Sequence, residues 1–311
     1  MENPAAVASV ADGHLFEPII VNRPPLPARS TLKAVVFNAR GGRHLAGIVD
    51  CLRRPPLQGA DVILLCEVAW RHRESGGRES ASELATALGM SFAYLPQFAV
   101  PRRTGSPESS LGNAILSSRP LAEAYAMPLT QQIRTRRIRG LVGTAAGLAA
   151  RATFNGKTIT LGVAHLNSRG SPAGRELQMR EFMTRFPREG PALIGGDFNT
   201  TTVDLRDRYA MMSAIRQLLL EPSRLWAPEQ WEPLFERLAE AGFDIGSANA
   251  PGRQTFTLSG IIPPPIRLKL DWIASRGLEP VPGSAAVRPA RQSIFGPRIS
   301  DHDFVVCDLR I

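Results

Sequence analysis

Runs of apolar residues that end in polar residues, glycine or proline recur along the chain and predict β-strands. The segment ADVILLCEV (60–68) is rich in Val, Ile and Leu with little polar alternation, which predicts a strand covered on both faces. The tetrapeptide FNGK (154–157) carries the asparagine–glycine pair of a tight hairpin turn. The other predicted strands lie at 32–40, 91–98, 111–118, 191–199 and 303–311, with two or three runs between 138 and 166, and with strand, proline-rich loop and strand over 255–275.

Five segments carry apolar residues at helical spacing and predict helices that cover the strands. They lie at about 45–52, 79–89, 174–186, 209–220 and 228–241. A proline pair in PPLQG ends the first predicted helix, and Gly89 ends the second. Strands and helices alternate irregularly, without a repeat or a dividing linker, so we expect one mixed α/β domain over 32–311. Residues 1–31 become rich in proline and are expected to form an irregular lead-in.

The charge balance favours anionic partners. The chain has 311 residues, with 37 Lys and Arg against 28 Asp and Glu, which gives a formal net charge of +9. Most of the basic residues are arginines, which suit nucleic acid, phospholipid headgroups or phosphorylated small molecules. A generally basic protein without such a partner is the alternative, because the arginines are spread along the chain.

Cysteine content and hydropathy point to an intracellular protein. Cys51, Cys66 and Cys307 are too few for a disulfide framework and indicate a reducing compartment. No apolar run approaches the roughly 18 residues of a membrane span, and no basic segment followed by an apolar block begins the sequence. We therefore expect a cytoplasmic protein without stable membrane insertion.

Polar residues stand at the tips of the predicted strands. Each one alone has a simpler interpretation: Asp197 as a turn former, Glu67 as a helix start, His165 as a hydrogen-bonded core histidine. Several such tips in one chain favour a shared site, because strand ends at one edge of a sheet meet in space. Carboxylate and amide oxygens are hard ligands that suit Mg²⁺ or Mn²⁺, and no zinc-type spacing competes. The residues are Asn38, Glu67, His165, Asp197, Asn199, Asp271, Asp301 and His302.

The segment LIGGDFNT (193–200) concentrates this pattern in eight residues. Gly195 and Gly196 allow the backbone to turn tightly at a sheet edge. In an extended chain, side-chain alternation points Asp197 and Asn199 to the same side and Phe198 to the other, where it anchors the turn. The pair then offers one acid and one neutral amide to a ligand.

The motifs FNAR, ILLCEV, GNAILSS, VAHLNS, LIGGDFNT, LDWIAS and ISDHDF occur in this order over residues 33–311. In this the chain resembles the endonuclease/exonuclease/phosphatase superfamily, the DNase I-like group that also holds sphingomyelinases and inositol polyphosphate 5-phosphatases. The resemblance implies an α/β four-layer sandwich, with two mixed β-sheets packed face to face and flanked by helices. It also implies a divalent metal at the common edge of the sheets.

The resemblance also implies roles for individual residues. Asn38 and Glu67 match the family's first metal-binding pair, and Asp301 matches a second metal ligand. Asp197 matches the aspartate that orients or deprotonates the attacking water, and Asn199 matches the asparagine that holds the phosphate or that water. The remaining matches are His302 beside the scissile phosphate, Asp271 as its partner, His165 at a position where DNase I also has a histidine, and Asn113 as a secondary substrate contact for which packing is the alternative.

The expected reaction is in-line attack of water on a phosphoester, with Mg²⁺ or Mn²⁺ as cofactor. A nuclease is the first expectation, because the loop 101–104 and the run IRTRRIR (133–139), with Arg136 as a substrate contact, suit a phosphate backbone. A solvated strand or loop is the alternative for that run.

Two other functions stay open. A sphingomyelinase-like or phosphoinositide phosphoesterase is the alternative, because clustered arginines also suit lipid headgroups. The segment GIIPPPI (260–266) is either a short apolar loop for such a surface or a rigid connector. The third hypothesis is a DNase I-like scaffold that only binds a partner.

Overall fold

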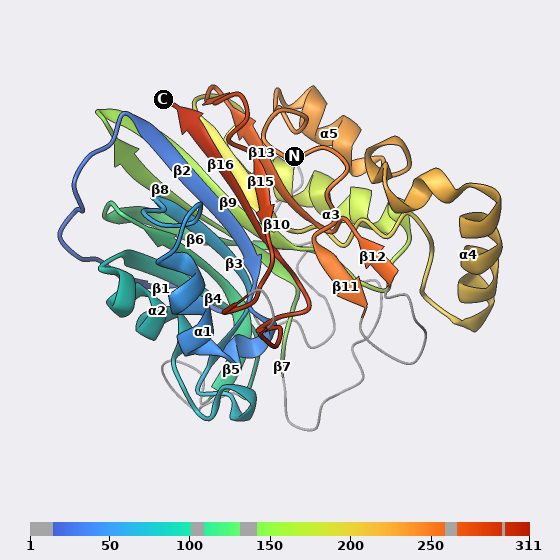
Figure 1. Ribbon diagram of the computed structural model, residues 1–311, viewed down its shortest axis with the longest axis horizontal. Coiled ribbons are helices and arrows are strands. Elements are labelled where there is room, and N and C mark those ends of the chain that lie inside the picture. The colour runs from blue at the N-terminus through green and yellow to red at the C-terminus, as the bar shows by residue number, and fades with distance from the viewer. Residues whose placement is uncertain (1–14, 101–108, 131–141, 259–265, 294–295) are drawn as a thin grey trace, which may run out of the picture.

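The computed structural model describes residues 15–100, 109–130, 142–258, 266–293 and 296–311. The two arginine-bearing segments singled out above, including Arg136, lie outside the described residues, and so does GIIPPPI except for Ile266. Figure 1 shows the described chain as two large β-sheets with helices around them.

The first sheet has nine strands among the described residues and is mixed. Its centre is the parallel pair of β2 and β3, and its other strand pairs are antiparallel. Its main path runs through β1 (Ile19–Val21), β4 (Ser91–Val100), β5 (Ser109–Ser117), β3 (Val62–Trp70), β2 (Thr31–Asn38), β16 (Phe304–Arg310) and β14 (Glu279–Pro280), with β7 (Val142–Gly143) beside β4 and β15 (Ala286–Arg288) beside β16.

The second sheet has five strands and is mixed as well. Its parallel pair is β9 and β10, and antiparallel strands flank that pair on both sides. Its order is β13 (Asp271–Arg276), β10 (Ala192–Asp197), β9 (Lys157–His165), β8 (Ala146–Phe154) and β6 (Leu121–Pro128). A separate two-stranded ribbon joins β11 (Phe256–Leu258) and β12 (Ile266–Leu268).

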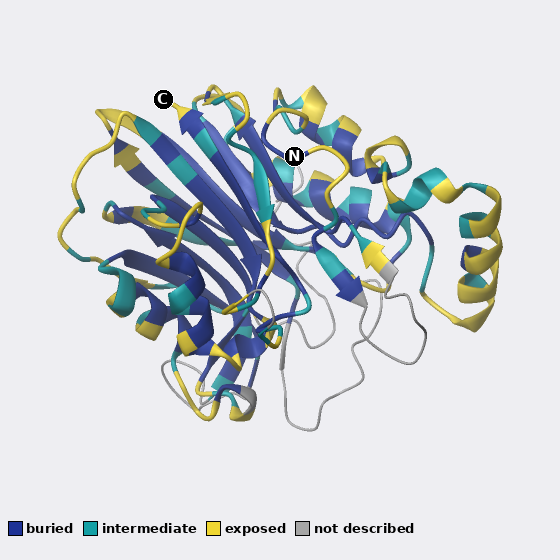
Figure 2. Ribbon diagram, viewed as in Figure 1, coloured by how far each residue is buried: buried dark blue, intermediate teal, exposed yellow. Residues whose placement is uncertain are grey.

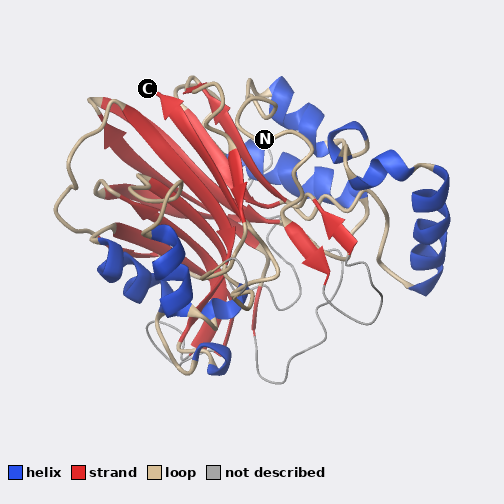
Figure 3. Ribbon diagram, in the orientation of Figure 1, coloured by secondary structure: helices blue, strands red, loops and turns tan. Residues whose placement is uncertain are grey.

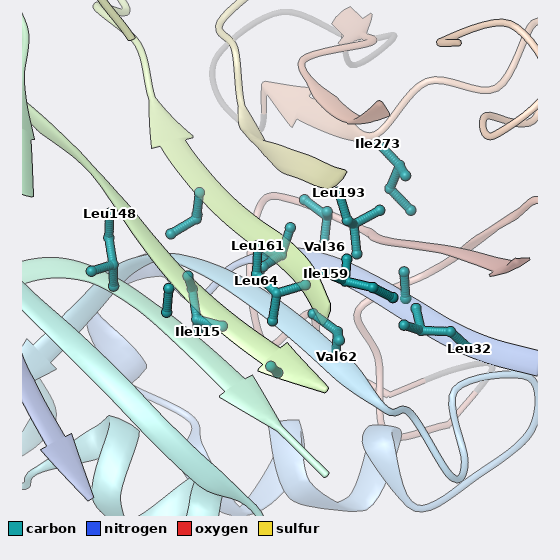
Figure 4. Packing of buried hydrophobic residues seen from close by; sticks show 14 of the residues in the cluster. Leu32, Val36, Val62, Leu64, Ile115, Leu148, Ile159, Leu161, Leu193 and Ile273 are labelled. Atoms are coloured by element: carbon teal, nitrogen blue, oxygen red, sulfur yellow. The ribbon is translucent and has the colours of Figure 1, made fainter. Parts of the chain in front are cut away.

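The two sheets pack against each other mainly through apolar side chains. Leu64 and Ile115 of the first sheet and Leu161 and Leu193 of the second belong to the same buried cluster (Figure 4). Strand β3 is buried along almost its whole length, because its alternate residues enter this interface and a second cluster beneath the helices. This confirms that ADVILLCEV forms a strand covered on both faces.

Helices cover the outer faces of both sheets, which confirms the expected four-layer α/β sandwich (Figure 3). Side chains of α1 and α2 pack with the outer face of the first sheet, and those of α3 and α5 with that of the second. Figure 2 shows the buried strands enclosed by these layers. The helices are α1 (Leu45–Leu52), α2 (Ser80–Leu88), α3 (Pro172–Arg185), α4 (Arg208–Leu220) and α5 (Leu234–Glu240). None of the described helices has the length and apolar content needed to cross a bilayer.

Three local expectations differ from the structure. The lead-in is not wholly irregular, because β1 pairs with β4. The alanine-rich strand β6 was not predicted, since alanine has little preference for strands. The helix expected over 228–241 is interrupted, with a 3₁₀ turn at Pro228–Gln230 and α5 starting only after Pro233. Pro233 has no backbone N–H to donate, so the helix cannot run through it.

Candidate active site

Strand register places three of the predicted site residues side by side. Asp197 ends β10, and it lies opposite His165 on β9 and opposite Asp271 on β13. Neighbouring residues in register across a sheet point to the same face. The second sheet therefore presents a row of one histidine and two carboxylates at one edge.

The two glycines before Asp197 are required by close packing. A Cβ on Gly195 would lie 2.5 Å from Cγ2 of Val36, on the facing sheet. Gly196 has a φ of +143°, and a Cβ there would lie 2.0 Å from the carbonyl oxygen of Ala164. Gly195 thus lets the two sheets approach each other at the edge that carries Asp197.

A β-bulge brings Glu67 to the same edge. The register of β3 and β5 shifts between Leu65 and Val68, so that Cys66 and Glu67 together oppose Asn113. Glu67 adopts a φ of +50°, in the left-handed region that residues other than glycine rarely occupy. Without the bulge, Glu67 would share the helix-covered face with Leu65; with it, Val68 takes that place and Glu67 is redirected.

Asn38 connects the two sheets at this point. It ends β2, and its Nδ2 donates to Oε1 of Glu67 at 3.1 Å and to Oδ2 of Asp197 at 3.0 Å. Its Oδ1 accepts a hydrogen bond from the backbone N–H of Arg40 at 3.0 Å. Asn38 is therefore held as a donor between two carboxylates that come from different sheets.

His302 enters the site from the turn before β16. Its Nδ1 donates to Oδ2 of Asp271 at 2.8 Å, and its backbone N–H donates to Oγ of Ser300 at 3.2 Å. The backbone N–H of Asp271 donates to Oγ1 of Thr255, while its second carboxylate oxygen has no hydrogen-bond partner among the described residues. Asp271 and His302 are both buried, so the ring has one fixed orientation.

Oδ2 of Asp197 is the meeting point of the cluster. The Nε2 atoms of His302 and His165 lie 3.6 Å and 3.7 Å from it. Burial raises the pKa of the Asp197 carboxyl above its ordinary value, although the charge of His302 counteracts this. Burial lowers the pKa of His302, but Asp271 and Asp197 outweigh it and raise the pKa to about 10. At neutral pH the site therefore contains an imidazolium next to an aspartate of increased basicity.

Asn199 does not follow the expected extended geometry. Its φ is +50°, so side-chain alternation does not set its direction, and that part of the prediction is wrong. Its backbone N–H donates to Oδ1 of Asp197 at 3.0 Å, and its Nδ2 donates to the carbonyl of Leu166 at 2.9 Å. Phe198 is buried in the cluster beneath α3, as an anchor for the turn. Asn199 thus closes a tight turn that holds Asp197 in place.

Two other predicted residues lie in different settings. Asp301 is partly exposed and its Oδ2 lies 3.6 Å from Nε of Arg40. Asn113 is fully buried and donates from Nδ2 to the carbonyl of Ala146, on the facing sheet. This contact supports the packing alternative for Asn113, and its role as a substrate contact stays a prediction.

The donor set fits a hard divalent cation. Glu67 keeps 40% of its side chain exposed, and within the part of the chain that the structure describes its carboxylate accepts a hydrogen bond from Asn38. Asp301 adds a second accessible carboxylate. Oxygen donors of this kind suit Mg²⁺ or Mn²⁺. Asp197, Asp271 and His302 also bring ligand atoms within 4.8 Å of one another, but His302 and Asp271 are engaged with each other.

Sequence reasoning missed the residues that support the site. Ser300 bonds the carbonyl of Asn38, and Arg175 forms a fully buried ion pair with Glu232. Oε1 of Glu232 accepts the backbone N–H of Thr202 at 2.7 Å, just after the Asp197 turn. Ser300 carried a sequence signal through its place in the motif ISDHDF, whereas Arg175 and Glu232 carried none.

Comparison with solved structures shows the same fold at low sequence identity. An endonuclease/exonuclease/phosphatase from Beutenbergia cavernae matches 91% of this chain and 72% of its own, with 19% identity and a TM-score of 0.59. D. rerio TDP2, solved with a single-strand DNA product, matches 91% of this chain and all of its own, with 19% identity and a TM-score of 0.58. Sphingomyelinase C from Streptomyces griseocarneus matches 90% of this chain and 99% of its own, with 15% identity and a TM-score of 0.52.

No curated protein sequence matches this chain. The model of the Endonuclease/Exonuclease/phosphatase family matches residues 35–302, a range that contains every strand tip described above. Together with the two packed mixed sheets and the cluster at their common edge, this match shows that the chain belongs to the Endonuclease/Exonuclease/phosphatase family.

Proposed function

We propose that the protein is a metal-dependent phosphodiesterase that hydrolyses its substrate by in-line attack of water. The observation that carries this proposal is the convergence of three nitrogen donors on one oxygen. Nδ2 of Asn38 and Nε2 of His165 and of His302 all lie within 3.7 Å of Oδ2 of Asp197. A fixed carboxylate surrounded by such donors suits the activation of water beside a phosphate.

Asp197 is the residue that orients the water and accepts its proton. Its pKa is raised by burial, which makes the carboxylate a stronger base than an exposed aspartate. Its Oδ1 is fixed by the backbone of Asn199 and its Oδ2 by Asn38, so the orientation of the carboxylate is set.

His302 is the residue that carries the compensating positive charge. Asp271 fixes its Nδ1, and the raised pKa of about 10 keeps the ring protonated at neutral pH. Its Nε2–H then stabilises charge that develops on the phosphate oxygens or donates a proton to the leaving oxygen. His165, on the other side of Asp197, supports the same charge.

Glu67 would hold the divalent cation, together with Asp301. Asn38, which was predicted as a ligand, turns its amide nitrogen toward Glu67 and would orient that carboxylate instead. A bound Mg²⁺ or Mn²⁺ supplies Lewis acidity at the phosphate and at the leaving oxygen. The bulge that redirects Glu67 is the structural support for this assignment, because it places an accessible carboxylate next to the cluster.

Nucleic acid is the proposed substrate. A cavity of about 500 Å³ lies beside the site and is lined by Arg43, Arg78 and Arg298 without any acidic residue. Arg298 joins the cavity to the site, since its Nη2 donates to the carbonyl of Asp301. With the net charge of +9, this surface suits a chain of phosphates that extends beyond the scissile one. TDP2, which shares the fold, was solved with single-strand DNA.

Lipid and inositol phosphates form the competing substrate class, because a sphingomyelinase shares the fold. The test incubates purified protein and Mg²⁺ or Mn²⁺ with single-strand DNA, duplex DNA, abasic duplex, RNA, sphingomyelin and inositol phosphates. Asp197→Asn is the control in every arm. We expect cleavage of at least one polynucleotide that the control does not show. Cleavage of lipid or inositol phosphate alone would overturn the nucleic-acid assignment.

A further inference from the structure

Helix α4 turns an apolar face away from the protein. Seven of the ten large apolar side chains that are exposed among the described residues lie on α4 or just after it. Only Ala214 of this helix is buried. The α4 face, as we name it, consists of Tyr209, Met211, Met212, Ile215, Leu219 and Leu220.

The spacing makes these side chains one continuous surface. Met212, Ile215 and Leu219 follow the i, i+3, i+7 pattern of one helix face, and Ala214 lies on the opposite side. Met212 is 71% exposed and Leu219 is 77% exposed. Figure 1 shows α4 at the right-hand end of the molecule, apart from both sheets. An apolar patch of this kind on the surface of a folded protein marks an interaction site.

The charged residues of α4 indicate an anionic partner. Within α4 the charged residues are Arg208 and Arg216, both exposed. The acids at its two ends are engaged, since Asp207 caps the first turn and Glu221 pairs with Arg224.

Trp226 follows α4 and is 51% exposed, and Tyr209 lies at its start. At 100° per residue both arginines fall on the same side of the helix as Met212, Ile215 and Leu219, so their charged ends can reach lipid phosphates while their stems lie along the apolar surface. Aliphatic side chains interspersed with arginine and accompanied by Tyr and Trp suit a membrane interface.

Two other occupants fit less well. A second copy of this chain carries the same +9 charge and the same two arginines, which repel each other across a symmetric contact. A helix of 13 residues is about 20 Å long, and one face of it covers less than the ~800 Å² per partner of a standard protein interface. Nucleic acid offers no apolar surface of matching size.

We propose that the α4 face docks on the surface of an anionic phospholipid bilayer. The apolar side chains enter the boundary between headgroups and acyl chains, while Arg208 and Arg216 contact the lipid phosphates. This inference does not depend on the substrate of the active site, because it concerns binding and is measured without catalysis.

The test is flotation of the full-length protein with vesicles of phosphatidylcholine alone or mixed equally with phosphatidylglycerol. We expect the wild-type protein to float with the mixed vesicles and to stay unbound with phosphatidylcholine alone. Replacement of two apolar residues (Met212→Gln with Leu219→Gln) should weaken partitioning at least about tenfold. Replacement of both arginines (Arg208→Gln with Arg216→Gln) should weaken it by a similar factor.

The matched control is Ile20→Gln, which removes an exposed apolar side chain on β1 instead. It should bind as the wild-type protein does, and circular dichroism should show that every variant is folded. Emission from Trp226, identified with Trp226→Phe, should shift to the blue when mixed vesicles are added. Three results would each overturn the proposal. The first is no flotation of the wild-type protein, and the second is unchanged flotation of the double apolar variant. The third is a wild-type protein that is dimeric without vesicles and becomes monomeric in the double apolar variant.

Discussion

His302 and Asp271 are joined by a 2.8 Å hydrogen bond across 31 residues of sequence, and both side chains are buried. His302 stays protonated at neutral pH, because its pKa in the folded protein is about 10 while an exposed histidine titrates near 6.5. The folded protein therefore binds a proton more tightly than the unfolded chain does.

The first prediction concerns stability against pH. The stabilisation from His302 is fully present below the unfolded pKa of about 6.5 and is lost as pH rises through the folded pKa of about 10. The free energy of unfolding, measured by urea denaturation in EDTA, should therefore fall between these pH values in the wild-type protein. The difference in stability between the wild-type protein and His302→Gln should shrink over the same window; a constant difference would contradict the assigned pKa.

The second prediction concerns the base. Asp197→Asn keeps the size of the side chain and removes the proton acceptor, so turnover should fall at least about 10²-fold while the fold is kept. Asp204→Asn, on a partly exposed aspartate outside the site, is the matched control and should leave turnover unchanged. Turnover like that of the wild-type protein in Asp197→Asn would remove Asp197 from the mechanism.

The third prediction concerns the cation. Glu67→Gln removes an accessible carboxylate at the bulge, and calorimetric titration should show at least about tenfold weaker binding of Mg²⁺ or Mn²⁺. Because the titration measures heat of binding without substrate, it is independent of turnover. Glu123→Gln, on an exposed acid of β6 with the same positive φ, should bind the cation as the wild-type protein does. Equal affinity in both variants would place the metal elsewhere.

The fourth prediction concerns the glycine that precedes Asp197. Gly196→Ala forces a Cβ to within 2.0 Å of a backbone oxygen at a left-handed φ, and should lower the free energy of unfolding by about 2 kcal/mol or more. Gly190→Ala also has a positive φ, but its added Cβ meets no atom within 4 Å. It should therefore cost only about 1 kcal/mol, from backbone strain alone. Equal losses in the two variants would show that crowding at Gly196 is unimportant.

The fifth prediction concerns the buried ion pair. Arg175→Met leaves the carboxylate of Glu232 buried without its partner, and should destabilise the protein by about 3–5 kcal/mol. Arg206→Met breaks a surface pair with Asp204 and should produce no measurable change. Thermal and urea denaturation of the two variants provide the comparison, and similar stabilities would argue against the supporting role of the buried pair.

Much of the site could be predicted from the sequence, because each polar residue at a strand end directly follows or precedes a local apolar run. Asp197, His165 and Asp271 each follow an apolar run, and sheet register alone brings them together. Helix α1 was predicted to the residue for a similar reason, since its apolar spacing and the following prolines are local. Local pattern and one edge of a sheet were enough for these features.

Features that depend on distant partners could not be predicted. The bulge at Glu67 exists because of pairing with β5, and no residue within β3 signals it. Asn199 has a left-handed φ and donates its side-chain N–H to the carbonyl of Leu166, at the end of a different strand, and neither feature is visible in the local sequence. Arg175 looks like any basic residue of a helix, and only the fold reveals its burial against Glu232. The sequence of α4 has the apolar pattern of a helix that packs on a core, so it does not reveal that this face points outward.

The Arg175–Glu232 pair fixes one wall of the site. Glu232 holds the backbone at Thr202, and Arg175 ties the same carboxylate to α3 and to the carbonyl of Gly170. That wall cannot yield to a bulky substrate without the exposure of a buried charge. If the proposed activity holds, we expect changes in the range of substrates, by natural variation or by engineering, to arise from loops on the other sides, while the stretch after Asp197 stays rigid.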